Sequence, residues 1–229
     1  MTKEERKLFD EWQELEHHQG DVFNYDGIID DAEWKKNKQN CRIMFLLKEA
    51  YHKDKMPTPY YELADKLRDY GPWKMWYKVA EWTRGLLLTA EGKPAPYTEL
   101  TKEECNKYLR KIAVVNIKKS HGKPNSEDDN LMWYAEKDAD LLYRQIEMVN
   151  PTIIVCGYTI GFLNKVIELK GEEPINKTGE NHCDNWHYKW KDRIILDYYH
   201  PAYQVPALMA YYGLVGCYKD ALESERKGE

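Results

Sequence analysis

The stretch RIILDYYHPAYQVP (residues 193–206) joins a strongly apolar run to a His–Pro pair. Residues 193–199 are mainly of the aliphatic, β-branched and aromatic types that favour a strand, and the proline after His200 restricts the backbone there. A nearly continuous apolar run, without apolar–polar alternation, is typical of a strand that is covered on both faces of its sheet. We therefore predict a buried strand that ends at His200.

Three further segments share this pattern, namely RIMFLL (42–47), IAVVNI (112–117) and TIIVCG (152–157). Segments with the three-to-four spacing of amphipathic helices separate or flank the four strands. Apolar strands that alternate with helices predict an α/β protein, a three-layer α/β/α sandwich around a central four-stranded parallel sheet. The predicted helices cover 2–15, 60–70, 72–88, 128–149, 158–169 and 205–222, and WHYKW (186–190) is predicted as a short edge strand.

The length of 229 residues favours one domain, 1–229, in which residues 1–40 form an N-terminal helical extension. NYDGIID (24–30) within this extension is expected to be irregular, and His17 and His18 are expected to face solvent at a helix end. No apolar run is long enough to span a bilayer, and the charged N-terminus is not a secretory signal. The five scattered cysteines (41, 105, 156, 183 and 217) suit the reducing cytoplasm and lack the spacing of an iron–sulfur or structural zinc site.

Polar side chains follow the predicted strands. Parallel strands end at one edge of their sheet, and ligands bind outside those carboxyl ends. We therefore expect a carboxylate, an amide, a lysine pair and a histidine to converge on this edge. They are Glu49 after the first strand, Asn116, Lys118 and Lys119 at the end of the second, and His200 after the fourth.

These groups together suit hydrolysis of a nucleic acid. A carboxylate facing a histidine can orient water or stabilise a cationic transition state while the histidine stabilises the departing group. An asparagine amide can read the edge of a nucleobase, and lysines can bind phosphates. The basic segment NIKKSHGKPN (116–125), which includes Lys123, supplies such lysines despite a net charge of −5; a solvated loop is the alternative. The sequence has no Gly-rich phosphate loop and no serine nucleophile elbow, so nucleoside-triphosphate and acyl-transfer chemistry are poorly supported.

The motifs LLKEAYH (46–52), VVNIKK (114–119), PTIIVCG (151–157) and YHPAY (199–203) resemble, in order and spacing, the strand-end motifs of the uracil-DNA glycosylase superfamily. The resemblance runs from about residue 42 to residue 222. It implies hydrolysis of the N-glycosidic bond of a flipped-out nucleotide in DNA. The implied roles are the catalytic carboxylate for Glu49, support of the leaving base for His200, reading of the base for Asn116, a guard at the pyrimidine C5 position for Tyr51, and a DNA-entering loop that begins with Ala202, Tyr203 and Gln204.

The resemblance further implies a monomeric DNA-binding enzyme that needs no metal or redox cofactor and acts in base-excision repair or anti-phage defence. Uracil is one candidate substrate and another modified pyrimidine is the other, including a hypermodified 5-substituted cytosine of viral DNA. Leu47 and Lys48 replace the small or amide residues usual before the carboxylate, and Ala202 replaces a serine. These departures leave the base open. The Asn116 amide suits uracil in one orientation and cytosine in the other, and Tyr51 excludes a C5 substituent only if its ring points inward.

Other interpretations remain beside this one. A binding protein on the same fold would recognise DNA or a nucleotide without cleaving it; the presence of both Glu49 and His200 favours the enzyme. His182, Cys183 and His187 suggest a metal site, although such residues in a polar loop are usually unligated. Candidates to stack on the base are Tyr60, Tyr61 and Trp73, each with a core or surface role as the favoured alternative.

Overall fold

The centre of the molecule is a mixed six-stranded sheet in the order β2-β5-β3-β6-β8-β7. The computed structural model describes residues 2–37, 41–51, 60–70, 72–175 and 186–227. The four middle strands run parallel, and each edge strand pairs antiparallel with its neighbour. The α/β class is confirmed, but the sheet has six strands instead of four. Its strands are β2 (Gly27–Ile28), β5 (Ala113–Lys118), β3 (Ile43–Glu49), β6 (Ile153–Gly157), β8 (Arg193–Tyr198) and β7 (His187–Trp190).

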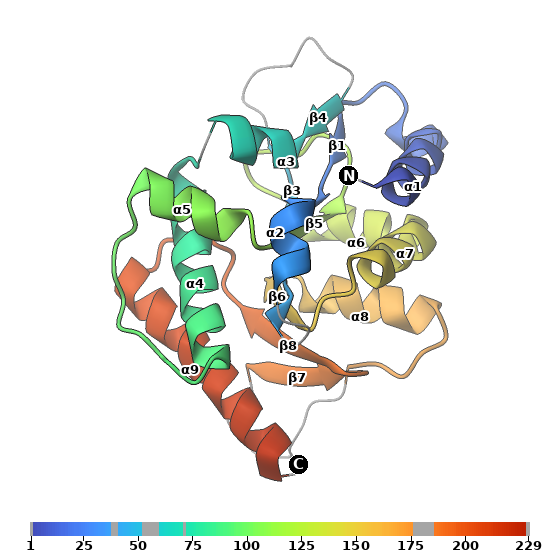
Figure 1. Ribbon diagram of the computed structural model, residues 1–229. Coiled ribbons are helices and arrows are strands. Elements are labelled where there is room, and N and C mark those ends of the chain that lie inside the picture. The colour runs from blue at the N-terminus through green and yellow to red at the C-terminus, as the bar shows by residue number, and fades with distance from the viewer. Residues whose placement is uncertain (1, 38–40, 52–59, 71, 176–185, 228–229) are drawn as a thin grey trace.

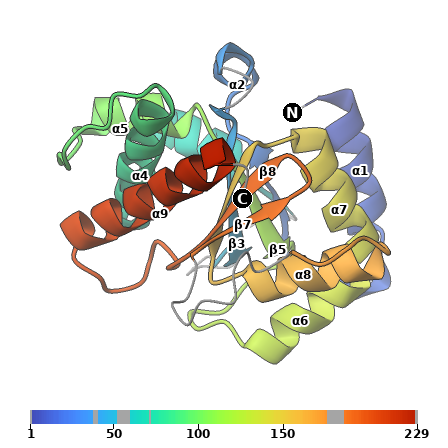
Figure 2. The same cartoon turned by 90° about the horizontal axis from the view of Figure 1, so that it is seen from below.

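Helices cover both faces of this sheet (Figures 1 and 2). Successive residues of β3 explain why its sequence is continuously apolar: Phe45 points into one core, while Met44 and Leu46 point into the other. Both faces of the sheet are therefore buried under helices, as the unbroken apolar pattern of β3 predicts. One face carries α4 (Lys74–Ala90), α5 (Lys102–Leu109) and α9 (Ala207–Lys227), and the other carries α1 (Lys3–Gln13), α6 (Asp128–Lys137), α7 (Ala139–Val149) and α8 (Ile160–Leu169).

The described N-terminal residues, 2–37, are built into the main body. The predicted capping box between Thr2 and Glu5 is present at the start of α1, and the apolar side of that helix is buried in the second core. The stretch predicted to be irregular instead forms two short strands, because its backbone pairs with distant segments. They are β1 (Phe23–Tyr25), which pairs with β4 (Tyr60–Glu62), and β2, which joins the main sheet. In the chain, η1 (Glu16–His18) precedes β1, and α2 (Asp31–Lys36) follows β2.

Three predicted helical segments differ in detail. Residues 60–70 begin as β4 and continue as α3 (Leu63–Asp65) and η3 (Lys66–Tyr70), because β1 recruits the first three residues into a strand. Residues 128–149 form two helices that break at Asp138. The helix α5 was not predicted, although its capping box, Thr101 with Glu104, is a recognised helix-start pattern. No helix within the described ranges is long and apolar enough to cross a membrane.

Candidate functional site

A cleft of about 560 Å³ opens at the carboxyl edge of the sheet. Glu49 reaches it from the end of β3, Asn116 from β5 and His200 from the segment after β8. The strand ends therefore bring together the carboxylate, the amide and the histidine at one edge, as expected of a parallel sheet. The lining also includes Leu47, Tyr51, Trp73, Lys123, Tyr158, Ala202 and Tyr203.

His200 is held as a neutral imidazole. Burial lowers its pKa to about 4, and the positive charges of Lys48 and Lys78 act in the same direction. The backbone N–H of Ala202 donates to His200 Nδ1 over 3.2 Å. Since Nδ1 accepts, the proton of the neutral ring resides on Nε2. His200 therefore offers an N–H donor from Nε2 without carrying a positive charge.

The side chain of Glu49 packs directly against Gly122 and fills the space that a side chain at position 122 would need. The Glu49 side chain is nearly buried, and its Oε2 lies 3.5 Å from Lys118 Nζ. The N–H of Gly122 donates to the Ala50 carbonyl over 2.9 Å, which holds the loop against the end of β3. A Cβ added to Gly122 would lie 2.6 Å from Glu49 Cγ. The absence of a side chain at position 122 thus allows the carboxylate to occupy its place.

Asn116 is oriented by Asp26, a residue that the sequence analysis did not single out. Asp26 Oδ2 accepts from the backbone N–H of Asn116 over 2.8 Å and from Asn116 Nδ2 over 3.0 Å. Lys119 Nζ donates to both Asp26 oxygens, and Gln145 Nε2 donates to Oδ1. A flipped Asn116 amide would set its own oxygen against this carboxylate. The amide therefore keeps Nδ2 toward Asp26 and has Oδ1 and its second N–H left for a ligand.

The predicted lysine group divides into buried and exposed members. Lys119 is fully buried in its ion pair with Asp26, so it does not reach a phosphate, which corrects its predicted role as a DNA contact. Lys118 is also buried, between Glu49 and the ring of Tyr134. Lys123 remains exposed at the rim and pairs with Glu127 over 2.9 Å. The loop residues Ala202, Tyr203 and Gln204 are exposed as well.

Two aromatic side chains flank the cleft at its mouth. Tyr51 is about half exposed, and its ring centroid lies 5.8 Å from that of His121. Trp73, one of the candidates to stack on a base, lines the cleft and packs edge-on against the buried Trp76. The side chains of Tyr60 and Tyr61 lie outside the described part of the structure.

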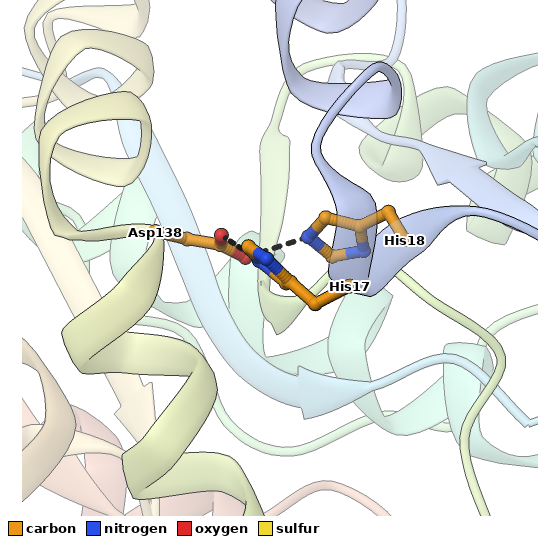
Figure 3. A group of neighbouring side chains, drawn as sticks. All are labelled: His17, His18 and Asp138. Atoms are coloured by element: carbon orange, nitrogen blue, oxygen red, sulfur yellow. Dashed lines mark hydrogen bonds and ion pairs between the residues drawn. The ribbon is translucent and has the colours of Figure 1, made fainter.

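His17 and His18 were expected to face solvent, but both rings turn toward Asp138 (Figure 3). His18 is 1% exposed. His17 Nε2 contacts Asp138 Oδ1 at 2.6 Å, and His18 Nε2 contacts Asp138 Oδ2 at 2.8 Å. Ser120 Oγ binds His18 Nδ1 over 2.7 Å. Both rings contact the Asp138 carboxylate at the α6–α7 break, and with this partner His18 is buried and His17 is partly buried.

This trio is also the group of side chains in the described structure that comes close enough to hold a metal ion. Two donors bound to one tetrahedral zinc ion lie about 3.3 Å apart, from bond lengths near 2.0–2.1 Å. The nitrogen–oxygen distances of 2.6 and 2.8 Å are instead those of hydrogen bonds. The trio therefore ties η1 to the start of α7. In the other candidate ligand set, His182 and Cys183 lie outside the described residues.

No protein-family model matches the chain, and no curated protein sequence is significantly similar to it. The geometry of the cleft is therefore the basis on which we infer a function.

Proposed function

We propose that the protein is a DNA glycosylase that hydrolyses the N-glycosidic bond of a flipped-out uracil or other modified pyrimidine and leaves an abasic site. The motifs that resemble the uracil-DNA glycosylase superfamily supply the expectation. The observation that carries the proposal is the neutral His200, with its proton on Nε2, in the same cleft as the Glu49 carboxylate.

The two groups suit the two halves of a dissociating glycosidic bond. As the C1′–N bond breaks, positive charge develops on the sugar, and the Glu49 carboxylate stabilises it and orients the attacking water. The electron pair leaves with the base as an anion, to which His200 Nε2–H donates a hydrogen bond. A neutral donor keeps its proton while it stabilises the anion. Water then forms the new bond to C1′, and its proton is released to solvent.

Base recognition is assigned to Asn116, with its Oδ1 acceptor and its remaining N–H. The cleft volume of about 560 Å³ lies in the range of sites that bind drug-sized ligands, which leaves room beside a pyrimidine ring. This supports a pyrimidine with a substituent at C5, such as a hypermodified cytosine of viral DNA, as well as uracil. Tyr51, a partly exposed residue of the cleft lining, is assigned the contact with that position. The setting we propose is base-excision repair or anti-phage defence in the cytoplasm.

The proposal is tested with oligonucleotides that carry uracil, hypoxanthine or a 5-substituted cytosine. We expect alkali-labile abasic sites with at least one of them. Removal of the charge in Glu49→Gln and of the donor in His200→Ala should each lower the single-turnover rate by about 100-fold or more, the scale of positioned electrostatic groups. Matched controls are Glu168→Gln on the exposed side of α8 and His187→Ala on the edge strand.

Near-normal rates in both cleft variants would rule out the assigned roles. DNA binding without any abasic product would favour a binding protein on the same fold, for which Glu49 and His200 are not required as reactive groups.

A further inference from the structure

Aromatic side chains gather on both sides of His200. The rings of Tyr199 and Tyr203 stack nearly parallel, with an interplanar angle of 6° and centroids 5.5 Å apart. Tyr158 meets both rings edge-on, at centroid distances of 5.7 Å. The ring centroid of Trp186 lies 5.6 Å from that of Tyr199, at the edge of the group. We call Tyr158, Tyr199 and Tyr203 the tyrosine platform.

The platform adjoins the candidate site directly. Tyr158 and Tyr203 both line the cleft, and Tyr199 immediately precedes His200. Tyr203 is 52% exposed and Tyr158 is 41% exposed, so ring surface remains open to solvent. Lys78 Nζ donates to the Tyr203 carbonyl over 2.9 Å and holds the loop at this position. A nucleotide seated in the cleft would place its chain neighbours over these rings.

The charges around the cleft favour one strand of DNA over two. Affinity for a duplex depends mainly on many phosphate contacts from lysine and arginine. Here Lys119 is buried and Lys118 is engaged with Glu49, and the chain carries a net charge of −5. Among the described residues, Lys48 and Lys123 line the cleft, each paired with a carboxylate. Lys74 and Lys78 line the adjoining pocket. These few cations are enough for a short piece of a single backbone.

The exposed tyrosine rings provide a second mode of binding to DNA, by stacking on bases. In a duplex, the faces of the bases are covered by neighbouring bases, whereas unpaired bases stack on aromatic side chains whatever their sequence. We propose that the tyrosine platform is a subsite for unpaired bases next to the flipped nucleotide, and that the protein prefers single-stranded DNA. This inference rests on the proposed function for the identity of its ligand as DNA.

The experiment measures binding separately from excision. The probe is a fluorescein-labelled 15-mer with one tetrahydrofuran abasic analogue, used single-stranded or annealed to its complement, and the readout is fluorescence anisotropy. The wild-type protein should bind the single strand at least 10-fold more tightly than the duplex. Tyr203→Leu and Tyr158→Leu should each weaken single-strand binding by roughly 5- to 100-fold, the loss associated with one stacked base.

Control variants distinguish the loss of an aromatic ring at the platform from a general loss of folded structure. Tyr203→Trp keeps an aromatic face and should retain the affinity within about threefold. Tyr212→Leu removes an equally exposed tyrosine from α9, outside the cleft, and should bind like the wild type. Thermal unfolding of each variant identifies any loss of structure.

Equal affinity for both probes, or full affinity in the two leucine variants, would overturn the inference. If excision is observed but the leucine variants bind normally, the inference about the tyrosine platform fails while the proposed glycosylase function stands. If no base is excised while binding still depends on the tyrosines, the platform stands and the proposed chemistry fails.

Discussion

His200 illustrates how burial and one backbone hydrogen bond prepare a single residue for chemistry. An ordinary histidine has a pKa near 6.5 and is partly cationic at neutral pH. Burial here lowers the pKa to about 4. The N–H of Ala202 then selects the tautomer. Neither feature follows from the His–Pro dipeptide itself; both depend on the loop that follows it.

We predict that His200 does not titrate between pH 5 and pH 8. Its ring resonances in a ¹H–¹³C NMR titration, identified by their loss in His200→Ala, should move only as the pH approaches 4. The unfolded chain binds this proton near pH 6.5. Between pH 6.5 and pH 4 the unfolded state therefore holds more protons, so this residue makes the free energy of unfolding fall as the pH falls through that window. A midpoint near 6.5 in the folded protein would contradict the assigned environment.

Asn116 and Asp26 provide a second test at this scale. Asp26→Asn alone would leave the Lys119 charge buried without a partner, which costs several kcal/mol. The double variant Asp26→Asn, Lys119→Met removes both charges and the carboxylate that orients the amide. We expect discrimination between matched uracil and cytosine derivatives to fall by about 10-fold, since a misplaced buried hydrogen bond costs about 1–3 kcal/mol.

The measurement is the ratio of single-turnover rates on the two oligonucleotides. The control variant Glu11→Gln, Arg144→Met removes an exposed ion pair from elsewhere on the surface. Unchanged discrimination in the double variant would show that Asp26 does not act through the amide.

At the scale of the element, helix packing depends on positions where a side chain is absent. Gly85 lies where α4 crosses α9, and a Cβ there would come within 2.6 Å of Tyr211 Cε2 and 2.7 Å of Val215 Cγ2. The hydroxyl of Tyr211 donates to the Ala95 carbonyl over 2.7 Å, which limits the movement of its ring. The close approach of the two helices therefore requires glycine.

We predict that Gly85→Ala lowers the free energy of unfolding by about 1–3 kcal/mol, the usual cost of overpacking. The matched control is Gly216→Ala on α9, where nothing lies within 4 Å of the added methyl group. That variant should be neutral or up to about 1 kcal/mol more stable, because alanine favours a helix over glycine. Urea denaturation measures both. Equal effects in the two variants would mean that the α4–α9 contact is looser than the structure shows.

At the scale of the whole molecule, the N-terminal residues complete both the core and the site. Leu8, Phe9, Trp12 and Phe23 are buried in the core on one face of the sheet. Asp26 orients Asn116 from the same part of the chain. The resemblance at the sequence level began near residue 42, yet the Asn116 amide, to which we propose to assign base recognition, is oriented by a residue before that point.

We predict that a protein lacking residues 1–30 does not fold. Burial of four large apolar side chains contributes on the order of 10 kcal/mol, similar to the whole stability of an average domain. Circular dichroism and thermal unfolding should show no cooperative transition. A chain that ends at Leu222 loses mainly exposed residues of α9 and should unfold like the full-length protein. Cooperative unfolding of the N-terminally shortened chain would show that the extension is dispensable.

The sequence by itself determined the buried strands and where they end. Residues such as Phe45, Val115 and Leu196 lie in unbroken apolar runs, and burial on both faces of a sheet is a strong local constraint on composition. The parallel arrangement then placed Glu49, Asn116 and His200 at one edge. The capping box of Thr2 and Glu5 likewise located the start of α1 from a few neighbouring residues.

Only the tertiary structure decided how polar residues pair. Asp26 lies 90 positions from Asn116 and His18 lies 120 positions from Asp138, and nothing local to either residue indicates its partner. The same holds for the edge strand β2 and for the burial of Lys119, whereas the edge strand β7 was predicted from the sequence. A charged side chain is as compatible with solvent as with an ion pair, so its place depends on which distant group the folded chain brings to it. Apolar residues have one favourable environment, and for that reason they were predictable.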